Sequence, residues 1–199
     1  MPWRFSFFVF FDIICHVKRA TFYEGGMNVD NLKQLSKGEI IALIKEGKVE
    51  AADLTDSGIC PTCFNRENDE VFYGDNTEKV IYEDDMFECF LVGKPRAVGH
   101  VAISTKKHFK DMMEIDNETC QRIFILSKKV MNILKEVYGA ESVYLCTMCD
   151  GPMNHFHVQL IPRYSFEKRG SKNFVKPRMD YIEDKEKVML LRRRISTDE

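Results

Sequence analysis

The residues best suited to chemistry lie in the stretch from Asn154 to Arg163. If this stretch is a strand, alternate side chains share a face, so His155, His157 and Gln159 point one way. The apolar side chains between them then point the other way and hold the strand to a core. An imidazole titrates near neutrality, so it can act as a nucleophile, a proton carrier or a metal ligand. We therefore predict that this strand face is the centre of the protein's chemistry.

Two pairs of cysteines have the spacing Cys-x-x-Cys, namely Cys60 with Cys63 and Cys146 with Cys149. Two thiols at this spacing can hold one metal ion from a tight turn, or they can form a redox pair. The redox interpretation needs a long helix after the first pair, whereas the polar residues 64–69 favour a turn. The second pair could complete a four-thiolate zinc site with the first, although Cys146 is expected inside a strand and could face the core.

Composition places the chain among ordinary globular proteins. Its 199 residues are 44% hydrophobic, which is enough to bury the core of one domain with appendages. The 29 basic and 31 acidic residues give a net charge of −2, so neither a nucleic acid nor a membrane is an expected partner. Seven cysteines without the spacing of a secreted scaffold favour a reducing compartment, and we expect a cytoplasmic protein.

The N-terminal quarter of the chain is expected to precede the main domain. Residues 1–26 are an apolar appendage, either part of the native protein or the product of an upstream start site. Asp12 and the lack of a small-residue cleavage motif argue against a secretory signal, and the run is too short to span a bilayer. Residues 27–57 form a helical extension that opens on a capping box at Ser36 and Glu39, and residues 53–58 form a polar link.

Residues 58–165 show the pattern of a sheet with one long helix. The expected elements are a hairpin over 79–83 and 87–92, a strand over 101–104, a helix over 117–138, a strand over 142–146 and the histidine strand. Asp116 can cap the helix and Gly139 can end it. The helical stripe expected in the core is Ile123, Phe124, Val130, Met131, Leu134, Val137 and Tyr138. This order predicts an α+β fold with an antiparallel sheet and the helix against one face.

Residues 166–199 form a charged C-terminal segment. The sequence Leu190-Leu191-Arg192-Arg193-Arg194 follows a run of alternating charges. It is either a solvated helix end or a basic patch that attracts phosphate-rich ligands.

The motif His-x-His-x-Gln at residues 155–159, followed by Pro162 and Arg163, resembles the signature of the histidine triad (HIT) superfamily. Further landmarks recur upstream in the same order: the Cys-x-x-Cys pair, the acidic hairpin over 82–85, Gly99-His100, Lys106-Lys107-His108 and the long helix. The similarity covers roughly residues 58–165, a domain-sized unit. It implies a nucleotide-binding domain with a five-stranded antiparallel sheet and a long helix packed on it.

The resemblance implies a role for each histidine of the motif. His157 would attack the α-phosphate of a nucleotide and form a covalent nucleotidyl-histidine, which water or another acceptor then resolves. In zinc-carrying members the metal ligands match Cys60, Cys63, His108 and His155 of this chain. Two thiolates and two imidazoles also make a closed tetrahedral set, which is the structural type of zinc site. Homodimers are common among relatives, so a homodimer is a further expectation.

Gln159 stands where the hydrolase branches more usually carry a third histidine. In this respect the chain resembles the nucleotidyltransferase branch of galactose-1-phosphate uridylyltransferases and dinucleoside polyphosphate phosphorylases. The Gln159 amide can donate to a non-bridging phosphate oxygen as charge develops there. Because an amide cannot shuttle protons, the leaving group could be one that departs without acid help, such as a phosphate. Hydrolysis is nevertheless favoured over transfer, since water is always available as an acceptor.

Three further residues are candidates for substrate binding. Asn154 is the one obvious polar side chain in residues 151–154, where relatives carry residues that contact phosphate. His100 could lie at the rim of the pocket or be structural, and Arg163 could add positive charge or be merely solvated. Residues 91–93 read Leu-Val-Gly where many members carry a carboxylate that holds the ribose.

Three functions therefore stay open. The first, which we favour, is a nucleotide hydrolase or nucleotidyltransferase that works through His157 and carries a structural zinc ion. The second is a catalytically silent nucleotide-binding module, prompted by the two altered contact positions. The third is a thiol redox protein built on the Cys-x-x-Cys pairs. The first two take a small-molecule nucleotide as their ligand.

Overall fold

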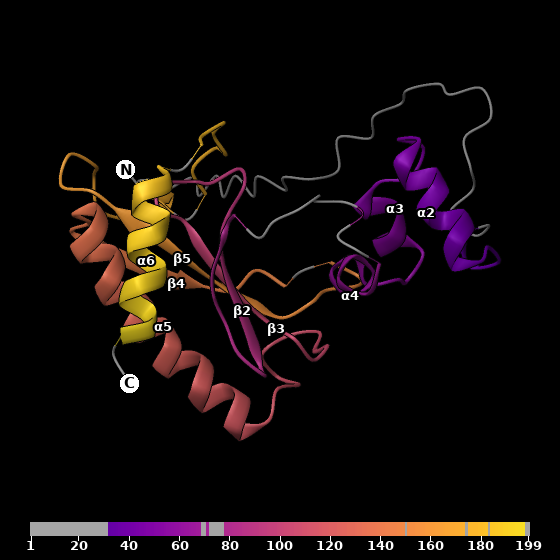
Figure 1. Ribbon diagram of the computed structural model, residues 1–199, viewed down its shortest axis with the longest axis horizontal. Coiled ribbons are helices and arrows are strands. Elements are labelled where there is room, and N and C mark those ends of the chain that lie inside the picture. Colours follow the sequence, from indigo (N-terminus) through magenta and orange to yellow (C-terminus); the bar gives the residue numbers. More distant parts are fainter. Residues whose placement is uncertain are drawn as a thin grey trace, which may run out of the picture.

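The computed structural model describes residues 32–68, 71, 78–149, 151–173, 175–182 and 184–197 (Figure 1). The expected appendage over residues 1–26 lies outside this range. The elements are α2 (Lys37–Lys45), α3 (Ala51–Asp56), α4 (Pro61–Glu67), β1 (Val80–Glu83), β2 (Phe87–Leu91), β3 (Val101–Thr105), α5 (Asn117–Tyr138), β4 (Ser142–Cys146), β5 (His157–Arg163), η1 (Ser171–Asn173) and α6 (Lys185–Thr197).

The strands form one antiparallel sheet with the order β1-β2-β3-β5-β4, which confirms the predicted α+β fold and its five-stranded sheet. The predicted hairpin is present as β1 and β2, β4 pairs with β5, and the position of β5 between β3 and β4 places the histidine strand inside the sheet. β5 begins at His157, so His155 lies just before the strand. The apolar residues of this stretch are buried as predicted, with Phe156 and Leu160 at 0% exposure.

Helix α5 has the predicted boundaries. The Asp116 carboxylate accepts a hydrogen bond from the Thr119 N–H (2.7 Å), and Gly139 ends the helix at φ 70°. Its core stripe is centred on Ile123, which is fully buried. The prediction for Phe124 is wrong, because this side chain is 43% exposed. A helix turns by about 100° per residue, so the position after Ile123 is carried away from the sheet.

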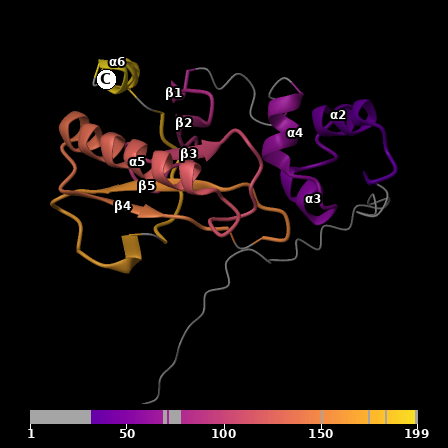
Figure 2. The same ribbon diagram turned by 90° about the horizontal axis from the view of Figure 1, so that it is seen from below.

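Helix α6 corrects the expectation of a solvated C-terminal helix end. Val188, Leu191 and Ile195 recur at helical spacing and are buried in the main core. α6 packs against α5 and β1, so both helices cover the same face of the sheet (Figures 1 and 2). The Arg192 Nε–H donates to the Val80 carbonyl oxygen (2.8 Å), which ties this helix to the edge strand.

The N-terminal helices make a second, smaller core. The capping box of α2 is present, with the Ser36 N–H donating to the Glu39 carboxylate (2.8 Å). The expected polar link is wrong, because residues 51–56 form α3. The fully buried Leu54 anchors that helix, and the Asp53 carboxylate caps the Glu50 N–H (2.7 Å). The buried members of this core are Leu32, Ile40, Ile44, Val49, Leu54 and Phe64.

The turn expected over residues 64–69 is partly wrong as well. α4 continues to Glu67, because Cys60 caps the helix and Pro61 fits its first turn. Phe64 of α4 packs in the second core, which therefore crosses the proposed boundary near Ser57. The division into a helical extension over 27–57 and a main domain over 58–165 stays a proposal. Figure 2 shows α2, α3 and α4 gathered at one end of the sheet.

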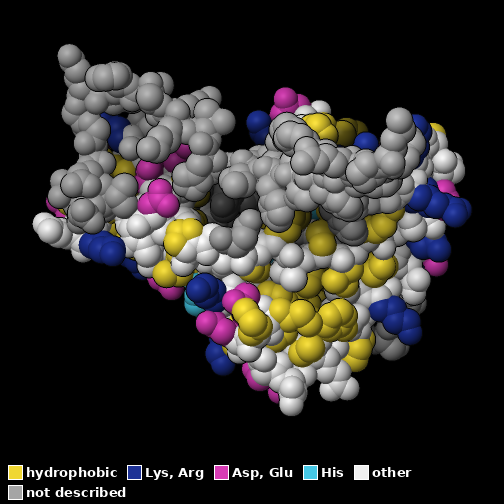
Figure 3. All heavy atoms as spheres, turned by 180° about the vertical axis from the view of Figure 1, so that it is seen from behind, with side chains coloured by type: hydrophobic (Ala, Val, Ile, Leu, Met, Phe, Trp, Pro, Cys, Tyr) yellow, Lys and Arg dark blue, Asp and Glu magenta, His cyan; other side chains and the backbone are white. Residues whose placement is uncertain are grey.

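Hydrophobic side chains gather on the face of the molecule shown in Figure 3. Across the described surface, the exposed large apolar residues include Phe124 and Ile125 of α5, at 43% and 61%. A homodimer that covers such a surface stays a proposal. No helix in the described ranges has both the length and the apolar character needed to cross a bilayer.

Gly99, just before β3, gives a prediction for stability. Its φ is 71°, and a Cβ atom built on it would lie 2.9 Å from Cδ2 of Tyr138. Gly139 has φ 70° but open space around it. Gly139→Ala therefore costs only the left-handed strain of about 1–2 kcal/mol. Gly99→Ala adds the ring clash, about 1–3 kcal/mol more. Urea unfolding measures both losses, and equal losses would rule out the clash.

Candidate functional site

The sheet face opposite to α5 and α6 is the floor of a cavity of about 780 Å³. Three strands contribute alternate side chains to this floor: Glu88 and Phe90 from β2, Ala102 and Ser104 from β3, His157 and Gln159 from β5. The strand register aligns them in two rows, one running Glu88–Ser104–His157 and the other Phe90–Ala102–Gln159. The predicted chemical face of the histidine strand thus opens on a cavity.

His157 has a defined tautomer. Its Nδ1 lies 2.9 Å from the His155 carbonyl oxygen, and since a carbonyl only accepts, Nδ1 carries the proton. Nε2 is then the unprotonated nitrogen, which carries the lone pair. The side-chain nitrogen of Gln159 lies 3.3 Å from this Nε2. The amide is therefore beside the nitrogen that would react, and the acceptor for Nδ1 is one that the sequence could not reveal.

Four side chains meet at the junction of α4 and the start of β5. They are Cys60, Cys63, His108 and His155, and their ligand atoms all lie within 4.8 Å of one another. The His155 Nδ1 is 3.5 Å from Cys60 Sγ and 3.3 Å from Cys63 Sγ. The Cys63 Sγ is 3.4 Å from His108 Nδ1. Tetrahedral zinc with ordinary bond lengths separates sulfur from nitrogen by about 3.6 Å, so the cluster could hold such an ion.

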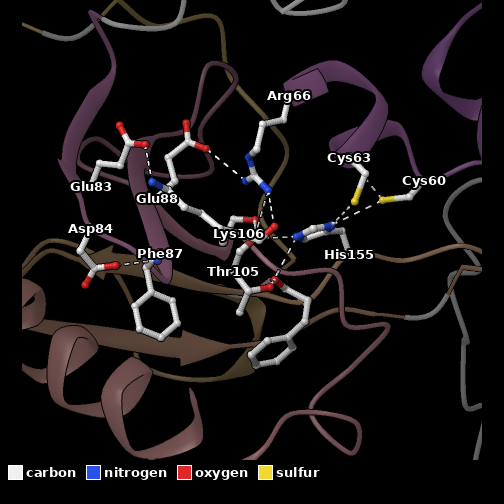
Figure 4. A network of polar contacts seen from close by, with 12 residues as sticks. Cys60, Cys63, Arg66, Glu83, Asp84, Phe87, Glu88, Thr105, Lys106 and His155 are labelled. Carbon is white, nitrogen blue, oxygen red and sulfur yellow. Dashed lines mark hydrogen bonds and ion pairs between the residues drawn. The ribbon is translucent and has the colours of Figure 1, made fainter. Parts of the chain in front are cut away.

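The surroundings of His155 prepare it as a ligand. Its Nε2–H donates to the Thr105 carbonyl oxygen (2.7 Å), which leaves the Nδ1 lone pair facing the two thiols (Figure 4). Metal-bound histidines are usually oriented by such a second hydrogen bond. Burial lowers the pKa of His155 to about 4 and so keeps the ring neutral, the form that binds metal.

The Cys63 thiol of this cluster is not activated for redox chemistry. Burial, with the neighbouring Cys60 as a second cause, raises the pKa of Cys63 to about 12, whereas a reactive thiol needs a lowered pKa. Cys146 and Cys149 do not join Cys60 and Cys63 in any metal-binding group found among the described residues. Neither the redox protein nor the four-thiolate site therefore has support from the geometry.

Arg66 joins α4 to the sheet beside the cavity (Figure 4). Its guanidinium pairs with Glu88 (3.3 Å) and donates to the carbonyl oxygen of Lys106 (2.8 Å). Arg66 also lines the cavity, yet it was not among the predicted site residues. The available signal was its spacing, because Arg66 lies three residues after Cys63 and so on the same side of α4.

The opposite wall of the cavity carries further basic residues that the sequence alone did not identify. These are Lys79 before β1, Lys94 in the loop after β2, and Arg178 in the C-terminal segment. Residues 91–93 also line the cavity. Glu88, which pairs with Arg66, is the one acidic side chain among the described lining residues.

Two of the predicted substrate contacts, Asn154 and Arg163, are not among the residues that line the cavity. Asn154 closes its own loop, since its amide accepts from the Gly151 N–H (3.0 Å) and donates to the Gly151 carbonyl oxygen (2.9 Å). Arg163 is at the far end of β5, about 20 Å along the strand from His157. The residue is 4% exposed, and its guanidinium pairs with Glu141 (3.0 Å). Arg163 therefore fastens β5 to the start of β4.

His100 is fully buried and is not among the residues that line the cavity, which favours the structural alternative over a place at the rim. The Arg96 N–H donates to its Nδ1 (3.1 Å), so the proton sits on Nε2. The nearby Gln159 side chain favours the charged form of the His100 ring and so raises its pKa. The Nε2 atom of His100 nevertheless has no acceptor at hydrogen-bonding distance among the described residues. Burial prevails and lowers the pKa of His100 to about 4.

The buried His100 predicts a loss of stability in acid. The unfolded chain binds the proton near pH 6.5 and the folded chain only near pH 4, so stability falls as the pH drops through this window. The full loss is roughly 3 kcal/mol. His100→Asn keeps a neutral acceptor and should flatten the fall, which unfolding free energies at pH 4.5, 5.5 and 7 would measure. Parallel profiles for both proteins would contradict the assignment.

This chain is similar to known proteins over a segment that includes the histidine strand. The profile of the HIT domain family matches residues 73–166. An uncharacterized HIT-like protein of Borreliella burgdorferi is 31% identical over 102 residues, which cover 46% of this chain and 73% of the relative. The chain belongs to the HIT family. An uncharacterized HIT-like protein of Methanocaldococcus jannaschii is 32% identical over 100 residues, 48% of this chain and 76% of the relative.

Among solved structures, a zinc-bound histidine triad family protein from Mycobacterium smegmatis superposes with a TM-score of 0.49. The two chains are 22% identical, and the superposition covers 59% of this chain and 83% of that one. The HIT match ends before η1 and α6, and it begins after α4. Arg66 and Arg178 of the cavity wall therefore lie outside the family match.

Proposed function

We propose that this HIT protein is a nucleotide hydrolase or nucleotidyltransferase that works through a covalent nucleotidyl-His157 intermediate. The observation that carries the proposal is the state of the His157 ring. Nδ1–H is held by the His155 carbonyl oxygen, so Nε2 is unprotonated; it lies at the cavity floor and accepts a hydrogen bond from the Gln159 amide. A nucleophile of this kind needs a neutral ring with a fixed tautomer.

The reaction has two displacements. In the first, Nε2 of His157 attacks the α-phosphorus, the bond to the leaving group breaks, and its electron pair departs with the leaving oxygen. The ring becomes cationic, and the hydrogen bond from Nδ1–H to the His155 carbonyl stabilises that charge. Gln159 donates to a non-bridging oxygen as charge builds up there. In the second, the oxygen of water or of another acceptor attacks the same phosphorus, the P–Nε2 bond breaks with its electron pair returning to Nε2, and the proton of the attacking oxygen passes to solvent.

The proposed metal is a structural zinc ion held by Cys60, Cys63, His108 and His155. When bound, it would supply a rigid tetrahedral link between α4 and the start of β5. His155 connects that link to the chemistry, because its backbone carbonyl orients the ring of His157. The chain therefore positions its nucleophile through the metal-ligand residue itself.

A second candidate is a catalytically silent nucleotide-binding module. It is favoured by the absence of a free carboxylate among the described cavity residues, since Glu88 is paired with Arg66. Such a module would bind a nucleotide in the cavity without catalysing a reaction. Between the two enzymatic outcomes we favour hydrolysis, because the cavity is open to water. Residues 58–165 would form the catalytic domain that binds the nucleotide.

Intact-mass measurement after brief mixing with nucleotide donors tests the proposal. The donors are dinucleoside polyphosphates, nucleotide sugars and nucleoside phosphoramidates. We expect an acid-labile gain of one nucleoside monophosphate, which peptide mapping under alkaline conditions places on His157. The mass of the adduct identifies the base. Nucleotide binding without an adduct from any donor, in zinc-loaded protein quenched within milliseconds, would favour the silent module instead.

A further inference from the structure

We propose that the loop over residues 164–173 binds single-stranded nucleic acid, through an exposed aromatic ring that stacks on a base and basic side chains that contact phosphates. The loop begins after β5 and ends with η1, and residues 167–173 lie beyond the HIT match. Figure 2 shows this segment on the side of the sheet opposite to α5. None of its residues lines the cavity, so the inference does not depend on the proposed function.

Two buried polar side chains hold the loop at its two ends. At the end of β5, Nη1 of Arg163 donates to the carbonyl oxygen of Glu167 (3.2 Å). In η1, the side-chain amide of Asn173 donates to the carbonyl oxygens of Lys168 and Gly170 (both 2.9 Å). Arg163 is 4% exposed and Asn173 is 5% exposed. The backbone of the loop therefore has a defined path that does not depend on its exposed side chains.

Phe166 is the exposed aromatic residue of this loop. It is 84% exposed, and its ring is stacked on the ring of Tyr164, with the centroids 5.6 Å apart and the planes 4° from parallel. The Tyr164 hydroxyl donates to the Val98 carbonyl oxygen (2.8 Å), which fixes that ring against the loop before β3. One face of the Phe166 ring thus rests on a fixed ring, and the other face is open to a flat partner.

The exposed charges of the loop are positive. Lys168, Arg169 and Lys172 are exposed, whereas Glu167, the one acidic residue of the loop, is half-buried and paired with a lysine outside it. Arg169 has a solvent-exposed contact with Glu141 (3.5 Å), which contributes little in water. Lys168 and Lys172 have no ion pair within the part of the chain that the structure describes. The net charge of −2 for the whole chain conceals this local excess.

An open aromatic ring in the same loop as three cations favours a single strand as the partner. Unpaired bases stack on aromatic side chains while lysine and arginine contact the phosphates, whereas a duplex hides the faces of its bases. An anionic membrane would also attract the cations, but stable binding there needs a larger apolar surface than one side chain. Phe166 is the one exposed large hydrophobic residue in the loop.

Fluorescence anisotropy with a labelled single strand of about 12 nucleotides tests the stacking contact. The zinc-loaded wild type would be compared with Phe166→Ala, Phe166→Trp and a matched control, Met113→Ala. Met113 is 88% exposed and lies outside both the loop and the cavity. We expect Phe166→Ala to weaken binding by about 5-fold or more, the effect of one lost base stack. Phe166→Trp and Met113→Ala should bind at least as tightly as the wild type.

The salt dependence of the same binding tests the phosphate contacts. A double variant, Lys168→Gln with Lys172→Gln, removes two of the three cations. Its plot of log Kd against log salt, between about 50 and 200 mM, should be shallower than that of the wild type by about 1.4, since each phosphate contact on a single strand contributes about 0.7. Lys128→Gln with Lys135→Gln is the matched control, because it removes the same charge from exposed positions on α5.

Three results would overturn the proposal. These are no binding of the strand by the wild type at low salt, equal weakening by Phe166→Ala and Met113→Ala, and displacement of the strand by a saturating nucleoside monophosphate, which would place it in the cavity. Binding to phosphatidylserine vesicles without binding to the strand would assign the loop to a membrane instead. Strand binding that persists in His157→Ala would support the proposal, whether or not the wild type forms a nucleotide adduct.

Discussion

Replacing His157 with alanine is expected to abolish turnover of any nucleotide donor that labels the wild type. The loss in kcat should be at least about 10³-fold, since no other group can form the covalent intermediate. The mass adduct should disappear at the same time. Steady-state rates and intact mass would be measured on the same zinc-loaded samples. Binding of the nucleotide should change by less than about 10-fold, because the cavity keeps its other walls.

Ser104→Ala is the matched control for this substitution. Ser104 is paired with His157 across β3 and β5 and lines the same cavity, but it has no proposed part in the reaction. It should retain activity within a few-fold of the wild type. An alanine variant at position 157 that still formed the adduct would show that another residue is the nucleophile. Full turnover without any adduct would show direct attack by water.

The sequence was informative wherever a local pattern decided the structure. Period-two alternation identified β5, and the cap at Asp116 with Gly139 fixed both ends of α5. Local patterns failed where a neighbour in space decided the outcome. Phe64 lies in the segment expected to be a turn, and Leu54 lies in the expected link. Both segments are helical because these two side chains pack in the same small core. The hydrophobic periodicity of a sequence does not reveal such a contact between separate segments.

The cavity residues also divide into those that a local pattern predicts and those that only tertiary packing brings together. His157 and Gln159 could be placed together from spacing alone, because alternate residues share a strand face. Arg66 and Arg178 come from separate parts of the chain, and only the packing of α4 and of the C-terminal segment brings them to one cavity. Asn154 and Arg163 were chosen for their polarity, but hydrogen bonds to Gly151 and a pair with Glu141 already occupy them. Side-chain type alone does not tell a free group from a satisfied one.

The cluster at Cys63 and the ring of His157 are structurally linked. His155 contributes its ring to the cluster and its carbonyl to His157, so a shift of one moves the other. Arg66 adds a second tie between α4 and the sheet through Glu88. Loss of the proposed metal should therefore reduce activity as well as stability.

Cys63→Ser is expected to remove bound zinc and to destabilise the fold. We expect about one zinc per chain in the wild type and almost none in the variant, measured by atomic emission after desalting. A structural zinc ion contributes folding energy directly, so a loss of about 3 kcal/mol is a modest expectation. For a chain of this size that lowers Tm by roughly 6–12 °C. Cys146→Ser is the matched control, because Cys146 is a half-buried thiol outside the cluster.

The pH dependence of zinc binding follows from the same thiol. Cys63 must lose its proton to bind the metal, and burial holds the pKa of the metal-free thiol at about 12. Zinc binding therefore releases protons, and the affinity should rise as pH increases from 6 to 8. A competition titration with a chelator would measure this slope in the wild type and in Cys146→Ser, which should agree. If Cys63→Ser kept its zinc while Cys146→Ser lost it, the metal would belong to the second cysteine pair, and the link between the metal and His157 would fail.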